Sequence, residues 1–256
     1  MFAPDSATVA DVVPSPNHGA RRNDVAPDIL LLHYTGMADA GAALARLCSS
    51  ESEVSAHYVV FEDGRIVQCV PEEQRAWHAG VSAWYAGVQA ASEATDINSR
   101  SIGIEIANPG HDFGYPDFPQ RQIESVIALC QDILARRPIP ATRVLAHSDV
   151  APARKQDPGE KFPWRDLHAA GVGHWVEPAP LTAGGTTLTR NHAGAEVAAL
   201  QSVLRSYGYG LEVTSTYDIA TETVVRAFQR HFRPARVDGV ADASTRRTLH
   251  DLLTQF

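Results

Sequence analysis

Residues 101–107 read SIGIEIA, and this stretch decides the fold class. Alternating residues point to opposite faces of a β-strand. One face carries Ile102, Ile104 and Ile106, and the other carries Gly103, Glu105 and Ala107. A glutamate within an apolar strand is costly unless it is paired or functional, so Glu105 is a candidate functional residue. An edge strand with a solvated outer face is the other explanation of this pattern.

Short apolar runs on both sides of this stretch predict further strands. ILLLH (29–33) and RVLAH (143–147) each end in a histidine, and HYVVF (57–61) and IVQCV (66–70) flank a hairpin signal. Between residues 101–107 and 143–147, apolar residues at helical spacing predict a helix with one apolar face, formed by Ile123, Val126, Ile127, Cys130, Ile133 and Leu134. We therefore expect an α/β domain over residues 1–178, with a central mixed β-sheet flanked by helices.

The C-terminal quarter of the chain has a different pattern. Residues 177–194, EPAPLTAGGTTLTRNHAG, show no periodicity and predict a linker, placed at 179–190. After it, apolar residues at helical spacing predict a small all-α domain of three helices over 191–256. This unit carries seven acidic and seven basic side chains, so its ligands are not expected to be selected by charge. We expect a flexible tether here; the competing idea is that the helices pack on the larger domain.

Composition and charge exclude several classes of function. The 256-residue chain has a formal net charge of −8, which argues against a nucleic-acid-binding protein, and no apolar run approaches membrane-spanning length. Its three cysteines, Cys48, Cys69 and Cys130, predict free thiols. No export signal is visible, which predicts a cytoplasmic location as encoded. A chain whose signal had been removed would look the same, and its location would be periplasmic or at the outer membrane.

Two predicted strands end in a histidine, His33 and His147. Side chains at strand ends form the floor of ligand crevices in α/β sheets, and two histidines with one carboxylate are typical of a catalytic zinc site. We favour Asp157 as the carboxylate because Pro158-Gly159 places it in a turn. Asp149 is the rival ligand, or it caps the following loop. Eleven histidines also give many chance pairs.

Lys155 lies two residues before Asp157, so both side chains project to the same side of an extended loop. A lysine there is placed to stabilise negative charge on a carbonyl oxygen, although a surface lysine is the more ordinary explanation. If the polar face of residues 101–107 lines the same crevice, Glu105 is placed to take a proton from the attacking water.

Four motifs together resemble the zinc-dependent N-acetylmuramoyl-L-alanine amidases of the AmpD/AmiD type. They are LLLHYTGM (30–37), VSAHYVVFEDGRIVQCVPEEQRAWHAG (54–80), SIGIEIANPG (101–110) and AHSDVAPARKQDPGEKFPW (146–164). The resemblance spans about residues 11–176. ATETVVRAFQRHF (220–232) and VDGVADASTRRTL (237–249) resemble a three-helix peptidoglycan-binding domain.

The resemblance implies one zinc ion per chain, held by His33, His147 and Asp157, with Glu105 and Lys155 as catalytic residues. It implies hydrolysis of the amide between a muramic lactyl group and L-Ala, with peptidoglycan or muropeptides as partners. Substrate binding is expected of His57, Trp77, His78 and Asn108, although a packed aromatic and buried histidines would give the same signals. The oligomeric state is left open.

Two other classes of function remain open at this point. The first is a muropeptide-binding protein that does not hydrolyse its ligand, and the intact set of candidate residues argues against it. The second is a wall anchor in which residues 191–256 do the essential work. An amidase assay with added metal separates the first from an enzyme, and binding of the two halves to sacculi tests the second.

Overall fold

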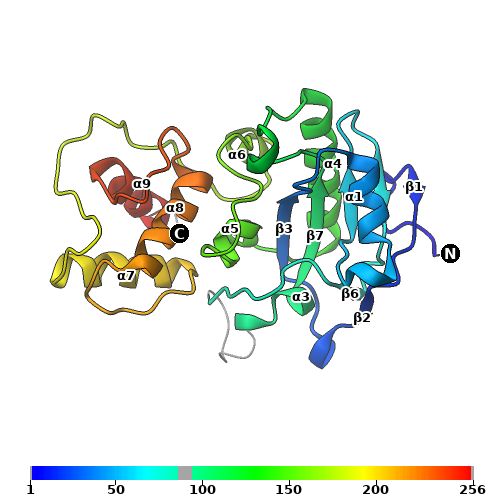
Figure 1. Ribbon diagram of the computed structural model, residues 1–256, viewed down its shortest axis with the longest axis horizontal. Helices are drawn as coiled ribbons and strands as arrows, with labels where there is room; N and C mark the ends of the chain where they lie inside the picture. Colours follow the sequence, from blue (N-terminus) through cyan, green and yellow to red (C-terminus); the bar gives the residue numbers. More distant parts are fainter. Residues whose placement is uncertain (1, 86–93, 255–256) are drawn as a thin grey trace.

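The computed structural model describes residues 2–85 and 94–254 of the chain, and Figure 1 shows how they are arranged. The strands are β1 (Asp11–Val12), β2 (His18–Ala20), β3 (Ile29–Tyr34), β4 (Tyr58–Val60), β5 (Ile66–Gln68), β6 (Gln74–Ala76), β7 (Ser101–Ile106) and β8 (Val144–Ala146). The α-helices are α1 (Ala40–Leu47), α3 (Ile97–Arg100), α4 (Gln120–Arg136), α5 (His147–Val150), α6 (Trp164–Ala169), α7 (Ala195–Tyr207), α8 (Ile219–Phe232) and α9 (Ala243–Thr254). Short 3₁₀ turns lie at Arg22–Asp24, Ser50–Ser52, His111–Phe113 and Ala141–Arg143.

Six strands form the main sheet in the order β1-β5-β4-β7-β3-β8. Strand β7 pairs in parallel with both β4 and β3, β3 pairs in parallel with β8, and β4 and β5 form the antiparallel hairpin. The predicted mixed sheet with flanking helices is confirmed. SIGIEIA is a central strand, which rules out the edge-strand explanation of Glu105.

The two faces of the sheet are covered by different helices. Buried side chains of α4 share a core with the isoleucines of β7, while Leu47 of α1 packs with Val59 and Val67 on the opposite face. Helix α1 begins where the Asp39 side chain accepts a hydrogen bond from the Ala42 backbone N–H at 2.6 Å, which caps its first turn. His33 lies opposite Glu105 in the β3–β7 register, so both side chains leave the sheet on the α1 side.

The three C-terminal helices pack directly on the larger domain. Figure 1 shows α8 beside α5, and one continuous cluster of buried residues runs from the sheet through α7, α8 and α9. The connecting segment is held as well: the Ala179 backbone is bonded to Thr248 and Ser244 of α9, and Leu188 pairs with Ala241. The expectation of a flexible tether is therefore wrong. Composition reports that a segment lacks periodic structure, but not whether its ends are docked.

Trp84 lies at the contact between the two domains. Its side chain is fully buried, its ring is 5.1 Å from that of Tyr209, and its backbone forms a bridge with the same residue. A Cβ added to Gly208 would lie 2.3 Å from the Trp84 ring, and Gly208 has φ +140°, so a glycine is required there.

No helix in the described ranges is long and apolar enough to cross a membrane. All three cysteines are free, as predicted.

Because the core is continuous, the two domains should unfold together. Calorimetry of the wild-type chain should show one cooperative transition. Trp84→Ala should lower the free energy of unfolding by about 3–5 kcal/mol, as loss of a large buried aromatic does. Val81→Ala, at a side chain that is 86% exposed, is the control and should change it by less than about 0.5 kcal/mol. Two separate wild-type transitions would show that the domains are independent.

Candidate metal centre

The candidate site lies at the carboxyl ends of two neighbouring parallel strands. His33 is near the end of β3, and His147 follows directly after β8 as the first residue of α5. Because β3 and β8 are adjacent, their ends bring both histidines to one edge of the sheet. Asp157 reaches the same point from the loop after α5, where the Ser148 N–H donates to its carbonyl at 3.0 Å.

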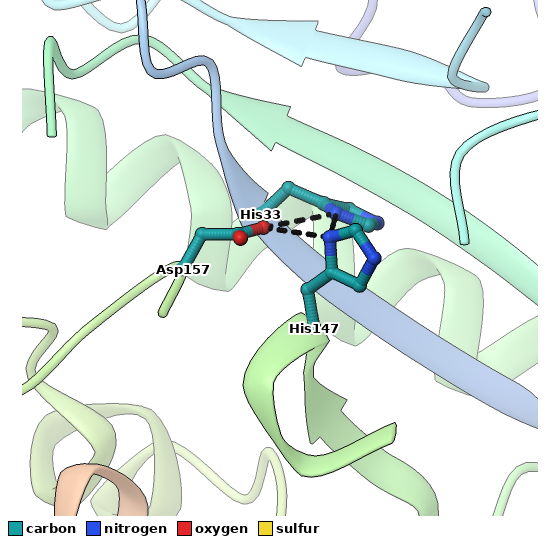
Figure 2. A group of neighbouring side chains, drawn as sticks. All are labelled: His33, His147 and Asp157. Atoms are coloured by element: carbon teal, nitrogen blue, oxygen red, sulfur yellow. Dashed lines mark hydrogen bonds and ion pairs between the residues drawn. The ribbon is translucent and has the colours of Figure 1, made fainter. Parts of the chain in front are cut away.

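Three ligand-type atoms converge at this point, as Figure 2 shows. The Nδ1 atoms of His33 and His147 are 2.9 Å apart, and Oδ2 of Asp157 is 3.2 Å from the first and 2.9 Å from the second. All three residues are buried, and together they form a group able to hold a metal ion. The structure thus brings together the three residues expected to be ligands.

The other nitrogen of each histidine ring has a partner of its own. Nε2 of His147 donates to the Ala79 carbonyl at 3.1 Å. Nε2 of His33 lies 3.0 Å from Nδ1 of His78, whose Nε2 contacts the Ser101 hydroxyl, which in turn donates to the Ile97 carbonyl. This chain ends on an acceptor, so we infer that each Nε2 carries the proton and each ligand-side Nδ1 is free.

Charge at the site is set by burial and by the close contacts. Burial lowers the pKa of His33 to about 4, and His147 acts in the same direction. Burial opposes ionisation of Asp157, but His147 and His33 outweigh it and hold the pKa of that carboxyl below its usual range. Two imidazole lone pairs and a carboxylate at these distances repel one another unless a cation lies between them. The donor set therefore fits a divalent metal such as zinc.

Glu105 lies beside this group on the floor of the same cavity. Burial raises the pKa of Glu105 well above its ordinary value, and the carboxylate of Asp157 adds to the effect, while Lys155 opposes it. Its Oε2 atom is buried and has no hydrogen-bond partner among the described residues. A carboxyl group with a raised pKa holds a proton more readily than an ordinary glutamate does, which suits a role in proton transfer.

The cavity has a volume of about 430 Å³ and lies between the sheet and α1. Lys155, Trp77 and His78 line it together with the candidate ligands His147 and Asp157. Its lining also includes residues that sequence reasoning did not assign: Tyr34, Met37 and Arg46. The first two belong to the motif LLLHYTGM, which could have drawn attention to them. Only the packing of α1 over the sheet reveals Arg46.

Two expected substrate-binding residues do not line the cavity. His57 is fully buried; its Nδ1 accepts from the Gly103 backbone N–H at 2.9 Å, and its Nε2 lies 3.1 Å from the Gln74 carbonyl. The side chain of Asn108 is bonded to the Pro116 carbonyl and the Gly110 N–H, which holds the loop after β7. Each polar group is engaged within the protein, and a role of either residue in substrate binding stays a prediction.

Asp149, the rival ligand, points away from the metal group. Its carboxylate accepts hydrogen bonds from the Ala146 backbone N–H, the Tyr209 hydroxyl and the His231 ring. The first of these caps the start of α5, before Asp149, and not the following loop that was considered as the alternative. The other two come from the C-terminal domain.

Comparison with known proteins agrees with this geometry. A family model described as N-acetylmuramoyl-L-alanine amidase matches residues 23–160, and one described as a peptidoglycan binding domain matches residues 193–249. The chain is 37% identical over 243 residues to the N-acetylmuramoyl-L-alanine amidase AmiD of Escherichia coli, covering 89% of this chain and 83% of the relative. It is 35% identical over 174 residues to the 1,6-anhydro-N-acetylmuramyl-L-alanine amidase AmpD of Enterobacter cloacae, covering 61% of this chain and 87% of the relative.

Solved structures give the same result. AmiD from E. coli, in complex with the substrate anhydro-N-acetylmuramic acid-L-Ala-D-γ-Glu-L-Lys, superposes with a TM-score of 0.75 at 36% identity, covering 93% of this chain and 92% of that one. AmpDH3 from Pseudomonas aeruginosa superposes with a TM-score of 0.73 at 30% identity, covering 100% and 99%. With these matches and the convergence of His33, His147 and Asp157, the chain belongs to the N-acetylmuramoyl-L-alanine amidase family.

Proposed function

We propose that this chain is a zinc-dependent N-acetylmuramoyl-L-alanine amidase that acts in cell-wall turnover. It hydrolyses the amide between the lactyl group of MurNAc or anhydro-MurNAc and the L-Ala of a stem peptide. The observation that carries the proposal is the buried His33–His147–Asp157 group. His147 and Asp157 line a cavity together with Glu105, whose buried Oε2 has no hydrogen-bond partner among the described residues. AmiD and AmpDH3 have been solved with anhydromuramic peptides, which supports this class of substrate.

Nδ1 of His33, Nδ1 of His147 and the carboxylate of Asp157 would hold one zinc ion per chain. Zinc supplies Lewis-acid polarisation of a carbonyl and lowers the pKa of a water molecule toward neutrality. His78 and the Ala79 carbonyl orient the two imidazole rings so that both Nδ1 atoms lie beside Oδ2 of Asp157 and would be available to the ion.

Glu105 is the general base and then the general acid. It takes a proton from the attacking water as the water oxygen bonds to the lactyl carbonyl carbon. When the carbon–nitrogen bond breaks, Glu105 returns a proton to the departing nitrogen of L-Ala. The products are the muramic lactyl acid and a peptide with a free amino terminus. The raised pKa of Glu105 makes its carboxylate a stronger proton acceptor in the first step, and the protonated carboxyl that results is the donor in the second.

Lys155 and the cavity walls contribute charge and shape. The Lys155 ammonium, which lines the cavity with Glu105 and Asp157, stabilises the negative charge that develops on the carbonyl oxygen. Trp77 provides an apolar wall for the glycopeptide. The C-terminal unit, placed at residues 191–256 after a catalytic domain of residues 1–178, binds the wall polymer by shape and hydrogen bonding because its charges balance.

The activity itself is tested by mass spectrometry of digests. The purified chain should release peptides with a free L-Ala amine from anhydro-muropeptide and from whole sacculi, and the two digests run side by side give the preference between them. Binding of muropeptide without any release, in the presence of zinc, would instead identify a non-hydrolytic recognition protein.

The metal ligands are tested by a histidine variant. His147→Ala removes one of three donors, so it should lose zinc, measured by elemental analysis, and with it amidase activity. His18→Ala, at an exposed histidine outside the cavity, should keep both. Full zinc occupancy in His147→Ala would overturn the ligand assignment.

The division of labour between the catalytic residues is tested separately. Glu105→Gln should retain zinc and substrate binding while kcat falls by about 10²–10⁴-fold, the range for a general acid–base group. Lys155→Met should retain zinc and lower kcat by about 10²–10³-fold. The chain has one other lysine, Lys161, which pairs with Asp117 outside the cavity, so Lys161→Met is a matched control. Near-normal kcat in either variant would remove that residue from the mechanism.

A further inference from the structure

Asp149 is a fully buried acid that the proposed chemistry does not use. It lies two residues after the ligand His147, on the same four-residue turn, α5. Its Oδ1 accepts from the Tyr209 hydroxyl at 2.8 Å, and its Oδ2 accepts from Nδ1 of His231 at 2.6 Å and from the Ala146 N–H at 2.8 Å. Two of its three donors therefore belong to the C-terminal domain.

A turn as short as α5 does not hold its own orientation. A single helical turn is unstable in isolation, so its direction depends on the groups packed around it. The Asp149 carboxylate bonds both the backbone just before His147 and two side chains of the neighbouring domain. Its bonds thus link the position of the His147 ring to Tyr209 and His231.

These two donors are themselves firmly held. His231, on α8, is 1% exposed, and its ring stacks on Trp164 of the larger domain with centroids 3.7 Å apart. Tyr209 is fully buried and forms the backbone bridge with Trp84. Neither side chain can turn away from Asp149 without opening the contact between the domains.

The C-terminal domain also holds the loop that carries Asp157. Nη2 of Arg230 on α8 donates to Oε1 of Gln156 at 2.9 Å, and Nε of the same arginine is 3.9 Å from Oε2 of Glu160. Helix α8 thus contacts this loop on both sides of Asp157, and it contacts α5 through His231. Two of the three candidate metal ligands are supported from the C-terminal domain.

We propose that the C-terminal domain is a structural part of the metal centre, in which Tyr209 and His231 are positioning residues that act through Asp149. The inference rests on the proposed zinc site and extends it beyond the residues of the amidase domain. A buried carboxylate that loses a hydrogen-bond donor is costly, so removal of either donor favours a shift of α5 that lets water reach Asp149. His147 moves with that turn, and the three ligands no longer converge at the same distances.

The test uses full-length variants that remove one hydrogen-bond donor and keep an aromatic ring at the same position. Tyr209→Phe and His231→Phe should each weaken zinc binding by about 10-fold, measured by competition with a chelator, as loss of an outer-shell partner does. At saturating zinc, kcat on a small soluble muropeptide should fall while KM stays unchanged. In the metal-free variants, amide hydrogen exchange over residues 146–157 should be faster than in the wild type.

Two further variants separate positioning from general stability. Tyr207→Phe removes a buried hydroxyl of the same domain that is hydrogen-bonded to His174. Among the described residues it donates no hydrogen bond to Asp149, so this variant should keep wild-type zinc affinity and exchange. His231→Asn places an amide nitrogen where Nδ1 lies and should recover part of the zinc affinity lost in His231→Phe.

Wild-type zinc affinity and wild-type exchange in both Tyr209→Phe and His231→Phe would overturn the proposal, even if those variants melt at lower temperature. Equal losses in Tyr207→Phe would also overturn it, because the effect would then be one of stability alone. A wild-type chain that binds zinc but releases no peptide would contradict the proposed amidase function instead, and the zinc measurements would still test the role of the C-terminal domain.

Discussion

The structure depends on the convergence of three electron-donating groups at one buried point. Two imidazole nitrogens and a carboxylate oxygen lie within 3.2 Å of one another. Rigid surroundings hold these groups together against their mutual repulsion, which a cation between them would relieve. The parallel pairing of β3 with β8 supplies the first part of that rigidity. The bonds from His33 to His78 and from His147 to the Ala79 carbonyl supply the second.

The same cavity is lined by two carboxyl groups whose surroundings shift their pKa values in opposite directions. Asp157 contacts two histidine rings, which outweigh its burial and keep it ionised. The buried Oε2 of Glu105 has no hydrogen-bond partner in the part of the chain that the structure describes. Burial and the nearby Asp157 charge therefore favour the protonated form of this carboxyl. Their surroundings alone thus distinguish the two carboxylic acids, one near the end of β7 and the other in the loop after α5. The charge of Lys155 opposes the rise in the pKa of Glu105.

Sequence reasoning reached the parts of this design that follow from periodicity and strand ends. The alternation in SIGIEIA placed Glu105 on the polar face, and histidines that end parallel strands had to meet at one edge of the sheet. The sequence does not predict which hydrogen-bond partner a polar side chain has in the folded protein. His57 and Asn108 look like ligand-binding residues by type, but each bonds the protein backbone instead. Arg46 had no signal of its own, because its place in the cavity follows from how α1 packs over the sheet.

The docking of the C-terminal helices on the larger domain could not be predicted from the sequence either. A segment rich in Gly, Pro and Thr predicts a lack of regular structure, whereas docking is decided by the aromatic side chains on either side of it. Trp84, Trp164 and Tyr209 bury their rings between the domains, and burial of a large aromatic contributes more than a balanced set of surface charges. A docked domain has a fixed orientation relative to the cavity, whereas a tethered domain would only stay near it.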